Sequence, residues 1–232
     1  MQLQPSANSH LLPAIAGMNL IAGGETLVGV SRLFILAMIL HPKVQKKAQE
    51  ELDNVVGHDR LPTVDDIPNL PYLEAVIKEV FRWQPVAPIS VPTLPRKTDY
   101  YQDYCIPTKT VVIHNIWALS RDEKMYPDAD SFNPDRFLVD NPPRDPRLWS
   151  FGIGRRICPG IAYAEEVYTT LFMTLLATVN MMPVLDKDGK EPPNAPSVRT
   201  TGRPVNVLIP FSYRMHPRSD AAVALLHSSV SA

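Results

Sequence analysis

Apolar residues recur at helical spacing in four stretches of this chain, and the longest of these comes first. Residues from about Ala14 to Leu40 are mostly apolar and are long enough for a helix of many turns. Gly23 and Gly24 lie within this stretch, and each glycine in a helix interior costs about 1 kcal/mol relative to alanine. The pattern predicts one long apolar helix with a weak point at these two glycines.

A second, amphipathic helix is predicted to begin at Pro42, because proline is favoured in the first turn of a helix. Charged residues four positions apart predict the surface ion pairs Lys46–Glu50 and Lys47–Glu51. Its apolar residues share one face: Val44, Ala48, Leu52 and Val55. We expect a solvated helix that buries only this face and ends near Gly57.

A third helix is predicted from about Pro71 to Trp83. Its apolar residues follow the i, i+3, i+4, i+7 spacing of one helix face: Leu73, Val76, Ile77 and Val80. Four prolines then follow within eleven positions, at 85, 88, 92 and 95. Because the residue before a proline is driven toward extended conformations, an extended path is predicted through this segment.

The rest of the chain is predicted to hold short strands, loops and one more helix. Thr110 to His114 is the clearest strand candidate, and residues 127–150 resemble a long loop. The last strong helical pattern covers about 160–180, and residues 181–218 favour turns and short strands. The predicted fold class is therefore mostly α with small β-pieces.

Length and composition exclude several classes of protein. The 232 residues carry a net charge of −1 with acids and bases in balance, which favours no nucleic-acid partner. Cys105 and Cys158 are the only cysteines, so a reduced intracellular setting is the default expectation, and a disulfide between them is the alternative. No repeat and no domain boundary is visible, so one domain over 1–232 is expected.

No membrane span is predicted. The best uninterrupted apolar run, Leu33 to Leu40, has only eight residues, whereas a span needs about twenty. Gly23, Gly24, Glu25 and Arg32 interrupt the stretch before it. Residues 11–22 resemble the apolar part of a signal peptide, but the ten residues before them contain no Lys or Arg, which argues against one.

Several common catalytic motifs are missing. The six histidines show no zinc-binding spacing, and the sequence has neither a G-x-S-x-G elbow nor a phosphate-binding Walker loop. Gly152 and Gly154 begin a G-x-G, but Ile157 occupies the third glycine position and no strand precedes the pair. A dinucleotide-binding loop is therefore excluded.

The segment FGIGRRICPG, Phe151 to Gly160, places Cys158 on a glycine-rich loop that leads into the last helix. Pro159 is expected at about the first helical position, so the thiol would lie beside the positive end of a helix dipole. That position favours the thiolate, which is the form that binds metals. A buried, inert cysteine is the alternative for Cys158 considered without its loop.

This loop resembles the cysteine-ligand loop of the cytochrome P-450 family, F-x-x-G-x-R-x-C-x-G. The match is carried by Phe151, Gly154, Arg156, Cys158 and Gly160. The resemblance implies that the Cys158 thiolate is the axial ligand of haem b, where such a ligand promotes O–O cleavage. It also implies that Phe151 packs against the porphyrin and that Arg156 faces a haem propionate.

Glu79 and Arg82 lie on the third helix, nearly opposite its apolar stripe. Helical periodicity alone predicts an exposed i, i+3 ion pair. However, EVFR resembles the family's E-x-x-R motif, and FNPDRF, which contains Arg136, resembles its P-E/D-R-F motif. The resemblance implies that these three residues form a buried network that supports the haem-binding loop.

The string AGGET, Ala22 to Thr26, resembles the family's oxygen-binding motif A/G-G-x-D/E-T, where the helix bulges over the haem. The resemblance implies that Thr26 donates a hydrogen bond to dioxygen and that Glu25 helps to supply protons. Close helix packing is the ordinary alternative for the two glycines. Arg96 occupies the place of a second propionate-binding residue, with a plain surface arginine as the alternative.

The resemblance covers residues 18–219 and matches the C-terminal half of a fungal-like microsomal member, with 220–232 as an unmatched tail. It implies the C-terminal part of the cytochrome P-450 fold, as a single partial domain that lacks the family's N-terminal half, membrane anchor included. Lys109 in IPTKT departs from the pattern, because it stands where relatives have a turn glycine that relieves a positive φ.

The function implied is a monooxygenase of secondary metabolism that inserts one oxygen atom of O2 into an apolar small-molecule substrate. Electrons would come from NADPH through cytochrome P-450 reductase. Substrate contacts are expected around 18–26, 86–91 and 201–203. The endoplasmic reticulum membrane is implied for a full-length member, while this chain without an anchor is assigned no location or a cytoplasmic one. The alternative is a truncated, non-catalytic fragment or pseudoenzyme that binds haem weakly or not at all.

Overall fold

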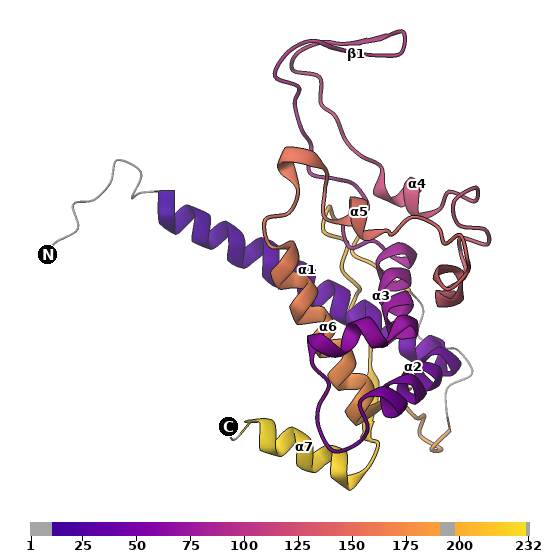
Figure 1. The fold of residues 1–232 in the computed structure, drawn as a ribbon. Coiled ribbons are helices and arrows are strands. Elements are labelled where there is room, and N and C mark those ends of the chain that lie inside the picture. The colour runs from indigo at the N-terminus through magenta and orange to yellow at the C-terminus, as the bar shows by residue number, and fades with distance from the viewer. Residues whose placement is uncertain (1–10, 191–197, 231–232) are drawn as a thin grey trace, which may run out of the picture.

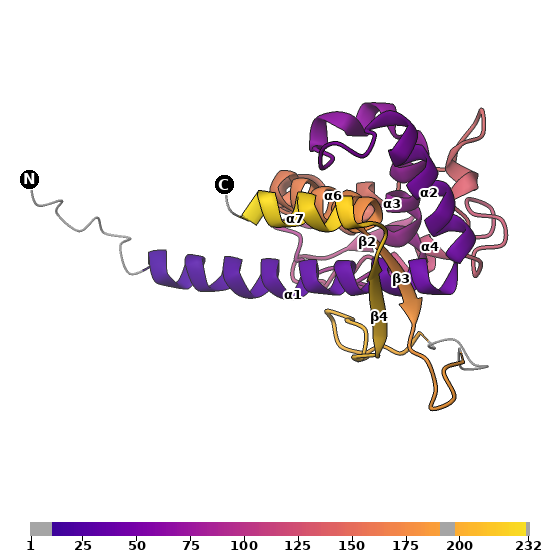
Figure 2. The same ribbon diagram turned by 90° about the horizontal axis from the view of Figure 1, so that it is seen from below.

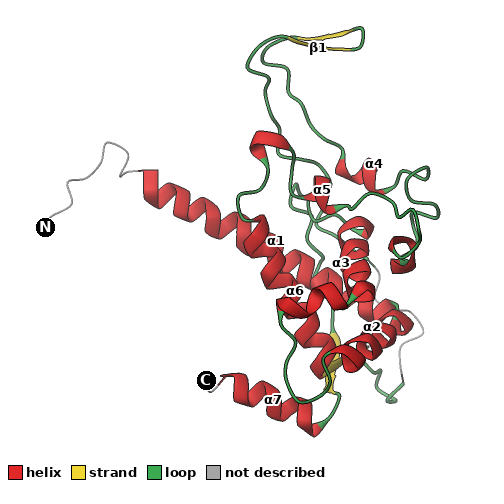
Figure 3. Cartoon of the chain, viewed as in Figure 1, coloured by secondary structure: helices red, strands yellow, loops and turns green. Residues whose placement is uncertain are grey.

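The computed structural model describes residues 11–190 and 198–230, and within them the chain is mostly helical with two small antiparallel sheets (Figures 1 and 3). This confirms the predicted fold class. The α-helices are α1 (Leu11–Leu40), α2 (Pro42–Val55), α3 (Pro71–Trp83), α4 (Ile116–Ser120), α5 (Arg147–Ser150), α6 (Ile161–Thr178) and α7 (Asp220–Val230). The 3-10 helices are η1 (Val64–Asn69), η2 (Pro134–Phe137) and η3 (Gly154–Arg156). The strands are β1 (Asp99–Tyr101), β2 (Tyr104–Ile106), β3 (Val179–Pro183) and β4 (Tyr213–Pro217).

The main hydrophobic core lies where the second half of α1 meets α6, α2 and α3. Phe34 on α1 and Phe172 on α6 are both fully buried, and their rings stack with centroids 3.9 Å apart. Leu73, Val76, Ile77 and Val80, the predicted stripe of α3, are likewise completely buried. Apolar burial of this kind is the main stabilising contribution to a helical core.

The first helix, α1, extends well beyond the rest of the molecule (Figure 2). It begins at Leu11, three residues before the predicted start, and it remains α-helical through Gly23 and Gly24. The weak point and the bulge expected there are therefore wrong for this structure. Buried residues begin only at Gly29, so the first half of α1 is largely exposed.

The outer face of α2 makes specific contacts instead of being merely solvated. Lys46 pairs with Glu50 at 3.8 Å as predicted, but the Lys47–Glu51 pair does not form. Lys47 instead binds Asp135 at 2.6 Å. Glu51 accepts the backbone N–H groups of Tyr72 and Leu73, each at 2.8 Å, and so caps the first turn of α3. A carboxylate is favoured at a helix N-terminus, where backbone N–H groups lack partners.

The predicted strand at Thr110–His114 is reduced to a single bridge between Val112 and Thr93. Thr93 and Val112 exchange two backbone hydrogen bonds, of 2.8 and 3.0 Å. The ladder cannot continue to Pro95, because proline has no N–H to donate. The strands β1 and β2, of three residues each, instead form a hairpin at the end of a projecting arm (Figure 1).

Four short or terminal helices were missed by the sequence pattern. The predicted loop at 127–150 contains η2 and α5, and α4 precedes it. The unmatched tail at 220–232 forms α7 over Asp220–Val230, which packs against α6. Helices of four or five residues are too short to show an apolar repeat.

Within the described residues, α1 is long and apolar enough to cross a membrane, with a mean hydropathy of 1.6 over its most apolar stretch. The prediction of no possible span counted uninterrupted apolar residues and so overlooked this helix. Half of that stretch is buried inside the protein. Helix α1 therefore meets the length and composition requirements of a membrane span, as the buried core helix of a soluble protein also does.

Candidate functional site

A buried charge network lies on the side of α3 opposite its apolar stripe. Glu79 and Arg82 are completely buried, and the guanidinium of Arg82 binds the carboxylate through two hydrogen bonds, of 2.7 and 2.8 Å. Arg136, on η2, donates to the same carboxylate at 3.2 Å. The exposed pair that helical periodicity predicts is therefore wrong, because the side of α3 opposite its apolar stripe is covered by residues 120–136.

Backbone carbonyls satisfy the remaining donors of the two arginines. Arg82 donates to the carbonyls of Ser120, Ala129 and Ser131 at 2.7–2.9 Å. Arg136 donates to the carbonyl of Pro127 at 2.8 Å. A buried guanidinium is tolerated when each of its charges is paired and hydrogen-bonded in this way. The network therefore holds the long segment after α4 against α3.

The cysteine loop begins where α5 ends and closes on itself through one short backbone hydrogen bond. The N–H of Cys158 donates to the carbonyl of Phe151 at 2.7 Å, and the N–H of Ile157 donates to the carbonyl of Gly154 at 3.2 Å. Gly160 is the N-cap residue of α6, so the helix begins two residues after Pro159. The prediction that Pro159 lies at about the first helical position is therefore wrong by two residues, since Pro159 precedes the N-cap of α6.

Two glycines give this loop its shape. Gly152 and Gly154 adopt φ values of +83° and +62°, a region that glycine enters without steric cost. A Cβ on Gly152 would also lie 3.3 Å from the carbonyl oxygen of Arg156. Neither position accepts a side chain without strain, so the loop depends on both glycines.

The thiol of Cys158 is partly accessible and free of any disulfide, as is the exposed Cys105. A Cβ on Gly160 would come within 3.9 Å of the Cys158 sulfur, so a glycine keeps this side of the sulfur open. A soft sulfur donor on a tight loop suits haem iron as an axial ligand. The residues present therefore fit a haem held from this side.

Aromatic rings connect the loop to the core. The ring of Phe151 is half-buried and lies 5.5 Å from Phe81 on α3, and Phe81 lies 5.0 Å from Tyr168 on α6. The first residue of the loop is therefore packed against the two helices that flank it. Tyr168 was missed by the sequence pattern, because an aromatic residue within an apolar helix carries no distinguishing signal.

The two arginines predicted to face propionates are both exposed. Arg156 lies in η3 within the loop, and Arg96 lies in the irregular segment before β1. Exposed guanidinium groups are available to pair with carboxylates. The structure places them in separate parts of the chain, one on the loop and one on the arm.

Glu25 and Thr26, the residues expected on the oxygen side of the haem, lie on the exposed half of α1. The hydroxyl of Thr26 donates to the carbonyl of Ala22 at 2.7 Å, as Thr often does within a helix. Glu25 is exposed to solvent. Among the described residues, neither Glu25, Thr26 nor Arg96 shares a hydrogen bond with the loop or with the Glu79 network.

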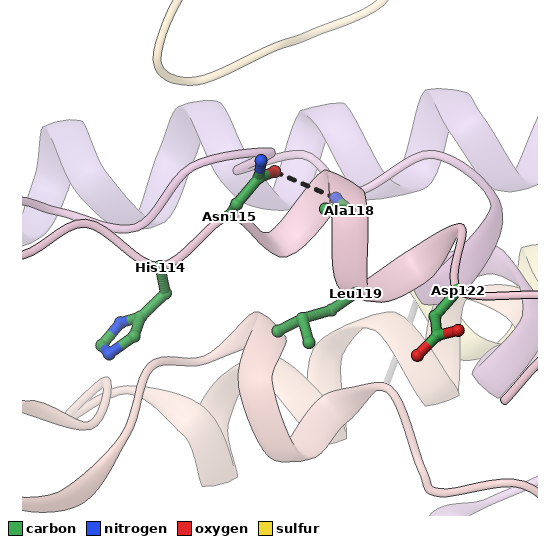
Figure 4. A pocket seen from close by; sticks show the side chains of 5 residues that line it. All are labelled: His114, Asn115, Ala118, Leu119 and Asp122. Atoms are coloured by element: carbon green, nitrogen blue, oxygen red, sulfur yellow. Dashed lines mark hydrogen bonds between the residues drawn. The ribbon is translucent and has the colours of Figure 1, made fainter. Parts of the chain in front are cut away.

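An open hollow lies beside α4, and Figure 4 shows the side chains that line it. Its lining consists of His114, Asn115, Ala118, Leu119 and Asp122. Asn115 caps α4 by accepting the N–H of Ala118 at 2.9 Å, so its side chain has a structural role. None of the predicted site residues lines this hollow.

Comparison with known proteins identifies relatives over most of the chain. The family model described as cytochrome P-450 matches residues 7–208. Cytochrome P-450 monooxygenase claR of Ampulloclitocybe clavipes is 41% identical over 220 residues, which cover 91% of this chain and 40% of the relative. Cytochrome P-450 monooxygenase ple1 of Rhodocybe pseudopiperita is 39% identical, with 97% of this chain and 43% of the relative covered.

The structure also superimposes on a solved protein. A zebra fish cytochrome P-450 with progesterone matches with a TM-score of 0.76 at 30% identity, covering 88% of this chain and 44% of that one. The predicted fold, a part of the cytochrome P-450 fold, is thereby confirmed. The chain spans about 40% of the length of the curated relatives that it matches.

Proposed function

We propose, from the premise that this chain belongs to the cytochrome P-450 family, that Cys158 binds haem b in a monooxygenase acting on an apolar small molecule. The observation that carries the proposal is the closed loop from Phe151 to Gly160, which presents a free, partly accessible thiol three residues before α6 begins. Bound there, haem supplies the activation of O2 and the transfer of one oxygen atom to the substrate.

The residues around the thiol would hold the cofactor by shape and charge. Gly152 and Gly154 keep the loop tight, and Gly160 leaves the sulfur uncovered. Phe151 would pack against the porphyrin with the part of its ring that Phe81 does not cover. Arg156 and Arg96 would pair with the propionate carboxylates, a charge-assisted contact that also orients the ring.

On the oxygen side, we assign proton supply to Glu25 and a positioning hydrogen bond to Thr26. The Thr26 hydroxyl must leave the carbonyl of Ala22 to donate to O2. Apolar contacts for a substrate would come from the same helix, where Met18 and Ile21 are 70% and 71% exposed. Electrons would reach the site from NADPH through a reductase, as in the family generally.

The test is the carbon monoxide difference spectrum of the reduced chain after reconstitution with haem. A strongly red-shifted Soret band is expected, because a thiolate ligand donates electron density to the iron. Cys158→Ser should lose that band, and Cys105→Ser, which changes an exposed thiol on the hairpin, should retain it. An unshifted band in the unsubstituted chain would contradict the proposal and favour the alternative, a non-catalytic fragment with weak or no haem binding.

A further inference from the structure

A second cluster of charges lies at the two ends of the cysteine loop and is separate from the Glu79 network. Arg147 is the first residue of α5, which ends where the loop begins, and its side chain is only 20% exposed. Three carboxylates from three segments surround its guanidinium group. They are Glu74 on α3, Asp145 just before α5 and Glu165 on α6.

The contacts of Arg147 are polyvalent. Its Nε donates to both oxygens of Asp145 at 3.1 Å, and its Nη2 donates to Asp145 at 2.6 Å and also to Glu74. Its Nη1 lies 3.8 Å from Glu165 Oε1. Hydrogen bonds between ionised groups in such a planar arrangement are among the stronger ones in proteins.

Lys78 adds a second positive charge to this cluster. Its Nζ lies 3.6 Å from Glu74 and 4.0 Å from Asp145. Burial by itself would raise the pKa of the Asp145 carboxyl, but its hydrogen bonds with Arg147 bring that pKa below its ordinary value. The Asp145 carboxyl is therefore charged at neutral pH, and its ion pair with Arg147 is present.

The position of this cluster relates it to the cysteine loop. Glu165 lies in the second turn of α6, after the loop, and Arg147 lies four residues before Phe151. Tyr168, one turn after Glu165, contacts Phe81, which in turn contacts Phe151. The two ends of the loop are thus connected twice, through charges and through rings, with α3 as the common support.

We infer that Arg147 is a positioning residue for the Cys158 loop: it holds α5 and α6 at a fixed separation through α3. That separation keeps the Cys158 N–H against the Phe151 carbonyl, and with it the direction in which the sulfur is presented. The importance of this residue for haem ligation rests on the proposed function, whereas its effect on the loop does not. No group in this cluster touches the reacting atoms.

The chain offers a closely matched control at Arg218. Its side chain is 18% exposed, and it binds both oxygens of Asp53, at 2.9 and 2.5 Å, and the carbonyl of Leu176 at 3.1 Å. It therefore matches Arg147 in burial and in its two-point pairing with an aspartate, but it meets one carboxylate where Arg147 meets three. Arg218 joins α2 to the far end of α6, so its loss should not reach the loop.

The experiment compares Arg147→Gln with Arg218→Gln in the haem-free chain by amide hydrogen exchange. Loss of charged hydrogen bonds at the loop ends should raise the exchange rate across 151–158 by roughly tenfold. Arg218→Gln should lower the melting temperature through loss of its Asp53 pair and leave loop exchange unchanged. Arg147→Lys, which retains the charge but not the fork, should recover part of the protection.

A milder variant keeps the test decisive if Arg147→Gln does not fold. Glu165→Gln removes only the contact to α6, at a side chain that is 41% exposed, and should raise loop exchange by a smaller factor. Equal loop protection in every variant that folds would overturn the inference.

Haem provides a second readout. After reconstitution, Arg147→Gln should shift part of the red-shifted carbon monoxide band to the unshifted position, and Arg218→Gln should not. Should the unsubstituted chain show no red-shifted band, the proposed function fails while the exchange experiment still decides the role of Arg147.

Discussion

Glu79 accepts hydrogen bonds from two arginines that come from different parts of the chain and share its buried environment. It also accepts the backbone N–H of Asn133 at 2.7 Å, so one carboxylate fixes both the charge balance and the path of the following segment. Removing such a charge leaves its partners buried and uncompensated, which costs more than the ion pair contributes.

Glu79→Gln should therefore lower the free energy of unfolding by about 3–5 kcal/mol, because Arg82 and Arg136 would lose their counter-charge. Urea unfolding followed by circular dichroism measures this loss. Lys46→Gln breaks an exposed pair with Glu50 and should change the same quantity by less than about 0.5 kcal/mol. Equal effects of the two substitutions would contradict the importance of the buried network.

Lys109 shows the cost of a side chain where a turn demands glycine. The sequence predicts a positive φ here, and the structure confirms it with a φ of +70°. The N–H of Thr110 donates to the carbonyl of Pro107 at 3.2 Å, so Lys109 occupies the third position of a four-residue turn. A positive φ at this position is characteristic of a type II turn and strongly favours glycine.

Lys109→Gly should stabilise the chain by about 1 kcal/mol, since it removes the strain of a positive φ at an exposed site. Differential scanning calorimetry should record a higher melting temperature. Lys109→Ala serves as the control, because alanine retains a Cβ and should show no such gain. A gain of equal size for alanine would point to charge instead of backbone strain.

At the scale of elements, the glycines of α1 differ in what surrounds them. A Cβ added to Gly24 would meet nothing within 4 Å. A Cβ added to Gly29 would lie 3.1 Å from side-chain atoms of both Val86 and Val207. Gly24 therefore has room for a side chain, whereas Gly29 packs closely against its neighbours.

Gly24→Ala should raise the stability by up to about 1 kcal/mol, because alanine restricts the unfolded chain and favours the helix. Gly29→Ala should gain less or lose stability, since the two valines must move. Thermal unfolding of both variants tests this. If Gly29→Ala were the more stable of the two, the packing around α1 would differ from that described.

The short helix η1 carries a carboxylate whose charge stabilises its first turn. Two hydrogen bonds from Arg60 and one from the backbone N–H of Thr63 lower the pKa of Asp66 to about 2. A carboxyl with a lowered pKa contributes stability above its unfolded value of 3.8 and loses it as the pH falls through its folded value.

Asp66→Asn should accordingly reduce stability at pH 7, and the difference from the unsubstituted chain should shrink between pH 4 and about pH 2. Chemical unfolding at a series of pH values measures the difference. A difference that stays constant across this range would show that the charge of Asp66 does not stabilise the helix start.

For the whole molecule, the dominant feature is the exposed half of α1, which extends away from the core (Figure 2). Met18, Leu20 and Ile21 are 70%, 77% and 71% exposed. Contiguous apolar surface of this kind drives association in water. The isolated chain should therefore associate with itself in a concentration-dependent manner.

Replacing Leu20 and Ile21 together by Lys should shift the sedimentation velocity profile from associated species to the monomer, because the charges keep the helix face hydrated. Val91→Lys is the matched control, since Val91 is 78% exposed but lies on the arm before β1 and not on α1. A monomeric unsubstituted chain would contradict the prediction.

Helix α3 organises the molecule around the cysteine loop. It carries Glu79 and Arg82 for the first network, and Glu74 and Lys78 for the cluster around Arg147. Between these charges, its apolar stripe packs against α1, α2 and α6. One thirteen-residue helix thereby holds the segment before the loop, the loop itself and the helix after it.

Local sequence specifies the long elements and the loop that carries the chemistry. The predicted bounds of α3 agree with the structure, and those of α1, α2 and α6 differ by three residues or fewer, because apolar periodicity over many turns is a local property. The Phe151–Gly160 motif and the positive φ of Lys109 are equally local, since glycine positions specify backbone shape directly.

The burial of polar groups and the pairing of charges, in contrast, follow from the folded arrangement of the chain. Helical periodicity places Glu79 at the surface, and its burial follows from Arg136 and the carbonyls of residues 120–131, which are distant in sequence. Arg147 and its three carboxylates show no motif at all. The physical reason is that burial and charge pairing depend on contacts between distant segments, and these contacts exist only once the chain has folded.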